Sequence, residues 1–163
     1  MKTFLRTFLL SVLLASSSPA ISACIVPDEA SLRTVWQSFR SDAVQGKPER
    51  IAPYFRFPLK LMSPFHDGKP VVVSKASFTK HYRSLFVSSV DGVELEIRRD
   101  LLKLTGSERF SRIRFDQKKC VLQTQVDVAD YVFTFHQQRG WLITAVRYGG
   151  DFSAIESDFQ GRK

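Results

Sequence analysis

The sequence predicts an α+β fold in which N-terminal helices pack on an antiparallel sheet. Apolar side chains recur every three or four residues from Leu32 to Ala43, which is the period of a helix with one buried face. In the second half of the chain apolar and polar residues alternate, which is the period of strands with one buried face. A length of 163 residues suits one domain and is short for two.

The composition excludes several classes of protein. Aromatic residues make 12% of the chain, including 14 Phe, which is more core-forming material than a disordered chain carries. Two Cys are too few for a disulfide scaffold, and 8 Gly with 7 Pro are too few for collagen or a low-complexity repeat. The formal net charge of +8 favours an anionic partner.

Residues 1–23 are typical of an export signal. Lys2 and Arg6 precede an apolar run from Phe8 to Ala15, and small residues follow it. The run is far shorter than the roughly 20 residues that a membrane-spanning helix needs. Cleavage before Cys24 leaves 140 residues with a net charge of +6. We expect this mature chain in the periplasm, with attachment to the outer membrane or secretion as alternatives.

Cys24 has two alternative roles. The segment Ile21-Ser22-Ala23-Cys24 resembles the bacterial lipoprotein box, in which the cysteine thiol is lipidated and attaches the protein to a membrane. Export also implies an oxidising compartment, where Cys24 and Cys120 can form one disulfide. The two alternatives exclude each other because both use the Cys24 sulfur.

Two helices open the mature chain. Pro27-Asp28-Glu29 begins the first, since proline suits a first helical turn and acids suit its positive end. Gly46 ends this helix, whose apolar stripe is formed by Leu32, Val35, Trp36, Phe39 and Ala43. A short helix follows from Lys47, and Pro53 and Pro58 keep it short. Its apolar face is Ile51, Tyr54 and Phe55.

A hairpin and a third helix come next. Alternation predicts strands at Phe57–Met62 and Pro70–Val73, joined by a turn at 66–69. Ser74 is placed to cap a helix whose apolar positions are Phe78, Tyr82, Leu85 and Phe86. Asp91-Gly92 breaks this helical pattern.

Alternating apolar and polar residues predict strands in the rest of the domain. Alternation covers 93–97, 112–115, 122–128, 131–135 and 141–148, with a turn at 138–140. Residues 99–106 fit either a strand or a helical turn. The polar tail, 151–163, is expected to be flexible.

This order of elements resembles the NTF2-like superfamily, as found in small exported bacterial proteins. The residues that carry the resemblance are Trp36–Arg40, Ile51–Leu59, Phe78–Phe86, Tyr131–Phe135 and Trp141–Ile143. The resemblance implies a single domain over residues 24–150, in which a strongly bent antiparallel sheet forms a cone around an internal pocket. The fold hosts enzymes, ligand binders, immunity proteins and docking domains, so it does not by itself select a function.

The first functional hypothesis is a non-enzymatic, exported binding domain for a small apolar ligand or a protein partner. It rests on the surplus of aromatic residues on consistent faces of the predicted elements. The candidates for the wall of the pocket are Trp36, Tyr54, Phe57, Phe78, Tyr82, Tyr131, Phe133 and Trp141.

The second hypothesis is an immunity or inhibitor protein that docks an acidic partner through a basic sheet face. Basic residues concentrate in one stretch of the chain, at Arg98, Arg99, Lys103, Arg109, Arg112, Arg114, Lys118 and Lys119. The same charge suits nucleic acid, but export argues against that partner. An exposed sheet face is also a candidate homodimer interface.

The third hypothesis is an enzyme that uses a carboxylate or histidine in the cone. The candidate acids and bases are His66, His81, Asp127, Asp130 and His136, and no two of them stand at a spacing typical of a catalytic pair. The sequence has no metal-ligand spacing, no phosphate-binding glycine loop and no serine-hydrolase elbow. We therefore expect no cofactor and no metal.

Overall fold

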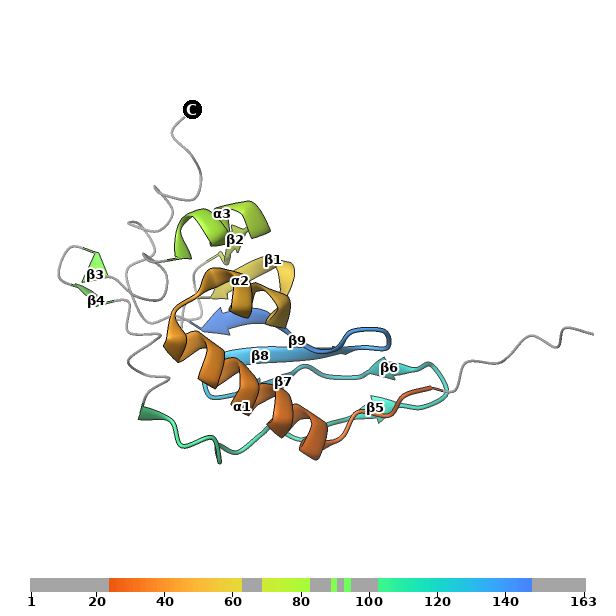
Figure 1. Cartoon of the computed structure of the whole chain (residues 1–163). Helices are drawn as coiled ribbons and strands as arrows, with labels where there is room; N and C mark the ends of the chain where they lie inside the picture. The colour runs from red at the N-terminus through yellow and green to blue at the C-terminus, as the bar shows by residue number, and fades with distance from the viewer. Residues whose placement is uncertain (1–23, 63–68, 83–88, 91–92, 95–102, 148–163) are drawn as a thin grey trace, which may run out of the picture.

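Figure 1 shows the computed structural model of the chain, which is described for residues 24–62, 69–82, 89–90, 93–94 and 103–147. The predicted export signal and the predicted flexible tail lie outside these residues, as do His66, Arg98 and Arg99.

The first helix, α1, spans Glu29–Gln45 and is capped at both ends. The Asp28 side chain accepts a hydrogen bond from the Ser31 backbone N–H, and the Ser31 hydroxyl accepts one from the Asp28 N–H. Gly46 ends the helix at a φ of 75°, which a residue without a Cβ adopts without strain. The predicted stripe is confirmed, with Val35 half-buried and four residues buried: Leu32, Trp36, Phe39 and Ala43.

The next elements also follow the prediction. α2 spans Pro48–Ile51 and continues into a 3-10 turn, η1, at Ala52–Tyr54. β1 (Phe55–Met62) and β2 (Val71–Val73) pair antiparallel, which confirms the predicted pairing of these strands. The turn predicted over 66–69 lies outside the described residues, except for Lys69.

The third helix, α3, spans Lys75–Lys80. Ser74 caps it by accepting a hydrogen bond from the Ser77 N–H, as the sequence predicts. Phe78 and Tyr82, two of the four predicted apolar positions, are buried. Leu85 and Phe86, the other two, lie outside the described residues.

Five strands form one mixed sheet in the order β2-β1-β9-β8-β7. β7 spans Val126–Val128, β8 spans Tyr131–His136 and β9 spans Gly140–Arg147. β8 is antiparallel to both of its neighbours, but β1 and β9 run parallel. The prediction of an antiparallel sheet is therefore wrong at this pair, because alternation identifies the buried face of a strand and not its neighbour. The coarser prediction, an α+β fold, is confirmed.

An arm, defined as residues 111–125, leaves the edge of this sheet. At its base the Ser111 N–H donates to the Asp127 carbonyl at 3.0 Å, and the Asp127 N–H donates to the Ser111 hydroxyl at 2.8 Å. At its tip β5 (Phe115–Asp116) pairs antiparallel with β6 (Val121–Leu122), beyond the N-terminal end of α1 (Figure 1).

The arm corrects two of the predicted strands. The strand predicted over 122–128 is divided into β6 and β7, because the chain leaves the sheet at 123–125. The strand predicted over 112–115 shortens to β5. A further small pair joins β3 (Ser89–Val90) to β4 (Val93–Glu94), so the strand predicted over 93–97 is described only for its first two residues.

The core lies between α1 and the sheet. Trp36 and Phe39 of α1 are fully buried. The Trp36 ring packs against Tyr131 and Phe133 of β8, with centroids 5.4 and 6.2 Å apart. The Phe39 ring packs against Phe55 at 5.6 Å and Tyr131 at 5.0 Å. Edge-on and tilted rings at these distances are the favourable geometry for aromatic packing.

The half-buried carboxylate of Glu108 attaches residues 103–110 to α1. The Trp36 indole N–H donates to Glu108 Oε2 at 2.6 Å. Glu108 Oε1 accepts hydrogen bonds from the backbone N–H groups of Thr105 at 2.6 Å and Gly106 at 3.0 Å. These bonds hold an irregular loop against the helix. The sequence had allowed either a strand or a helical turn for residues 99–106.

The same hydrogen bonds set the pKa of Glu108. Partial burial raises the pKa, but the indole and the backbone N–H groups stabilise the charged form more strongly, so the pKa is lowered from 4.5 to about 2. A group whose pKa is lowered by folding stabilises the fold above its unfolded pKa, and this contribution is lost as the pH falls toward the folded pKa.

We expect Glu108→Gln to lower the free energy of unfolding by about 1–3 kcal/mol at pH 7. The amide has one neutral acceptor oxygen, whereas the carboxylate offers two charged oxygens to the N–H groups of Trp36, Thr105 and Gly106. The difference between wild type and variant should shrink between pH 4.5 and pH 2, as the wild-type carboxylate is protonated. Urea unfolding monitored by tryptophan fluorescence measures both effects. Glu29→Gln, which removes only an exposed ion pair with Arg33, is the control and should change stability by less than about 0.5 kcal/mol.

Candidate functional site

A disulfide joins Cys24 to Cys120 and ties the start of the described chain to the tip of the arm. Asp116 shapes this tip, because its carboxylate accepts hydrogen bonds from the N–H groups of Lys118 and Lys119 at 3.0 and 3.1 Å. Since the bridge occupies the Cys24 sulfur, the structure holds the disulfide alternative of the two that the sequence left open.

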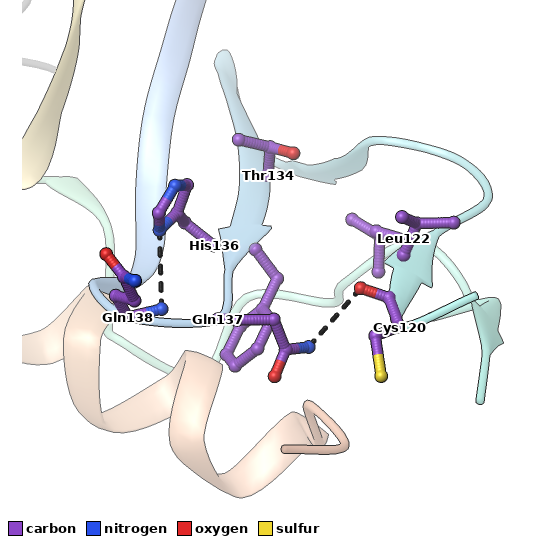
Figure 2. Close-up of a pocket in the computed structure, with 8 residues that line it drawn as sticks. Cys120, Leu122, Thr134, His136, Gln137 and Gln138 are labelled. Carbon is purple, nitrogen blue, oxygen red and sulfur yellow. Dashed lines mark hydrogen bonds between the residues drawn. The ribbon is translucent and has the colours of Figure 1, made fainter. Parts of the chain in front are cut away.

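Gln137 reinforces the bridge from the other side. Its Oε1 accepts a hydrogen bond from the Ile25 N–H at 2.9 Å, and its Nε2 donates to the Ile25 carbonyl at 3.0 Å. Nε2 also lies 3.4 Å from the Cys120 carbonyl, a contact that Figure 2 shows. One amide therefore connects three segments: the N-terminal segment, the arm and the turn after β8. The residue type in the sequence carries no signal for this role, because it depends on where the bridge places Ile25.

A groove of about 470 Å³ lies between the arm and β8. It forms because β7 pairs with β8 only from Tyr131 to Phe133, while β8 continues to His136 and β6 belongs to a different sheet. Figure 2 shows Leu122 on the arm and Thr134 on β8, on opposite sides of this groove. The lining residues are Cys120, Val121, Leu122, Thr134, Phe135, His136, Gln137 and Gln138.

The chemistry of the groove is apolar and neutral polar. Leu122 and Phe135 are half-buried hydrophobic side chains that also pack against the core. The eight lining residues include no Asp, Glu, Lys or Arg. Three exposed hydrophobic side chains belong to the segments that the disulfide brings together, namely Ile25 (56% exposed), Val26 (49%) and Val121 (49%).

The arm and the loop before it carry exposed cations. Five of the basic residues between 98 and 119 are exposed and take part in no ion pair with a described residue: Arg109, Arg112, Arg114, Lys118 and Lys119. Lys103 is exposed as well. Arg98 and Arg99 lie outside the described residues, so their proximity to this group stays a prediction.

The aromatic residues predicted for a pocket wall all belong to one hydrophobic cluster. Tyr54 and Phe57 are half-buried, and the other six are buried. Their rings pack on one another: Phe57 lies 5.3 Å from Phe78, and Phe78 lies 5.9 Å from Tyr82. The Trp141 indole N–H donates to the Ser31 hydroxyl at 3.0 Å, which joins β9 to α1. The structure thus brings these residues together as packed rings.

The candidate acids and bases that the structure describes lie at three places: around the turn between β7 and β8, at the far end of β8 and at the end of α3. Asp127 accepts a hydrogen bond from the Arg147 guanidinium at 2.9 Å, and Asp130 lies in the turn between β7 and β8. His136, at the other end of β8, accepts a hydrogen bond from the Gln138 N–H through Nδ1 at 3.3 Å. His81 is half-buried at the end of α3.

Two further features are absent from the described residues. They contain no group of three or more His, Cys, Asp or Glu side chains that is placed to hold a metal ion. They contain no helix that is both long and apolar enough to cross a membrane. Comparison of the chain with protein-family models, with curated proteins and with solved structures gave no match.

Proposed function

We propose that this chain is an exported, non-enzymatic binding domain that docks an acidic protein partner through the arm. The observation that carries the proposal is a group of five exposed cations that form no ion pair with a described residue: Arg109, Arg112, Arg114, Lys118 and Lys119. Cations in this state attract an acidic surface over a distance of about 10 Å at moderate salt and accelerate its association.

The way the arm is held favours a docking surface over a merely solvated face. The disulfide fixes the tip, Gln137 fixes the adjoining N-terminal segment, and Ser111 fixes the base. A surface that is already ordered loses less conformational entropy when it binds than a free loop does. The cations near the tip, Lys118 and Lys119, follow Asp116 in a hydrogen-bonded turn and share this order.

Two further features support the class of protein that we propose. The order of helices, hairpin, third helix and strands resembles the NTF2-like superfamily, and the α+β architecture supports this part of the proposal. A disulfide persists in exported proteins and is rare in the reducing cytosol, which supports export.

Charge reversal on the arm tests the proposal. We expect the double variant Arg112→Glu/Arg114→Glu to bind a labelled peptide of alternating Glu and Ser at least roughly tenfold more weakly than wild type, because two attractive charges become repulsive. Fluorescence anisotropy at several salt concentrations measures the affinity, and wild-type binding should weaken as salt rises.

The matched control is Lys47→Glu/Lys80→Glu, which changes the net charge by the same amount at exposed positions before α2 and on α3. It should retain wild-type affinity. Equal loss in both double variants would show that net charge alone attracts the peptide and would reject the arm as the docking surface.

A further inference from the structure

We infer that the groove between the arm and β8 receives one apolar side chain of the acidic segment that the arm attracts. This inference rests on the proposed function and adds a recognition rule to it: a hydrophobic anchor flanked by carboxylates.

The position of the groove couples it to the cations. Leu122 on its arm side pairs with Phe115 across β5 and β6, and Arg114 precedes Phe115 directly. The backbone also links the two features, since the Gln123 N–H donates to the Arg114 carbonyl at 2.8 Å. Cys120, which lines the groove, follows Lys118 and Lys119 in the same turn. A chain that places carboxylates on these cations therefore passes the groove.

The size and lining of the groove suit a side chain with its adjoining backbone. A volume of about 470 Å³ accommodates a leucine or phenylalanine together with nearby peptide groups. Val121 and Leu122 of the arm supply the apolar contact for the anchor, while the Phe135 ring packs against Phe115 and Trp141. Thr134, His136 and Gln138 supply a hydroxyl, an imidazole and an amide, which are groups that hydrogen-bond peptide N–H and C=O. The lack of charge among the lining residues keeps the acidic groups of the partner outside, on the cations.

Exposed hydrophobic side chains beside the groove agree with an occupant that covers them. Ile25, Val26 and Val121 are each about half exposed, on segments joined by the disulfide and by Gln137. Apolar side chains gathered at one place on a surface and surrounded by charge are typical of a protein-binding site.

Two peptides that differ at one position test the inference. Both alternate Glu with Ser; one has a central Leu and the other a central Ser. We expect wild type to bind the Leu peptide roughly tenfold or more tightly than the Ser peptide, which is the gain from burying one such side chain. Thr134→Phe, which fills the groove, should abolish this difference and leave the affinity for the Ser peptide unchanged.

A second variant and a control complete the experiment. Gln138→Trp covers the groove from an exposed turn position and should act like Thr134→Phe, so the test does not depend on β8 tolerating a larger side chain. Thr79→Phe, an exposed position on α3, should keep the Leu preference.

Two outcomes distinguish failure of the groove inference from failure of the proposed docking function. If wild type binds the Leu and Ser peptides equally, and both better than a neutral Gln–Ser peptide, the groove inference fails and the acidic docking function stands. If neither acidic peptide binds better than the neutral one, the proposed function fails as well.

Discussion

Replacing Phe39 with alanine is expected to lower the free energy of unfolding by about 3–5 kcal/mol. Phe39 is fully buried on α1, and its ring contacts the rings of Trp36, Tyr54, Phe55 and Tyr131. The substitution removes the ring from the centre of this group and leaves a cavity that rigid neighbours cannot fill. Urea unfolding monitored by circular dichroism gives the difference.

The control for this variant is Val72→Ala on β2, where the side chain is 57% exposed and should contribute less than about 0.5 kcal/mol. The comparison also bears on the small-ligand hypothesis. A loss below about 1 kcal/mol at Phe39 would contradict a filled core and would favour an open space among the aromatic rings.

Removing the disulfide is the second large effect. The double variant Cys24→Ser/Cys120→Ser is expected to lose about 2–4 kcal/mol of stability, because the unfolded chain regains the freedom that a bridge across 96 positions removes. Denaturant unfolding with and without reductant measures the loss. Wild type should weaken by a similar amount in reductant, whereas the variant should be insensitive to it.

The bridge also bears on binding. Cys120 lines the groove, and Ile25 is held next to it by Gln137, so the unbridged variant should lose part of its preference for the Leu peptide even where it remains folded. Stability equal to wild type in the double variant would contradict a closed bridge and would return the lipid alternative for Cys24.

Local signals made much of the fold predictable. The ends of α1 follow from Asp28, Ser31 and Gly46, which act on their own neighbours through hydrogen bonds and backbone conformation. The hairpin of β1 and β2 and the cap at Ser74 are local in the same sense. The parallel pairing of β1 with β9 was missed, because it joins segments that are distant in the sequence and leaves no mark on either one.

The candidate site was predictable only in part. The pairing of Cys24 with Cys120 was one of two alternatives that the sequence left open for Cys24, and the cations of the arm are visible as a run of basic residues. The groove was not visible. It exists because the chain leaves the sheet at 123–125 while β8 continues, and a period-two pattern through 122–128 hides that departure.

The place of β9 has a consequence for how the protein forms. β9 is the last described strand along the chain, yet it lies in the middle of the sheet, between β1 and β8. Until it is present, the hairpin of β1 and β2 and the hairpin of β7 and β8 share no strand. A chain that is still being synthesised therefore carries two separate halves of the sheet, and cooperative folding of the sheet waits for residues 140–147.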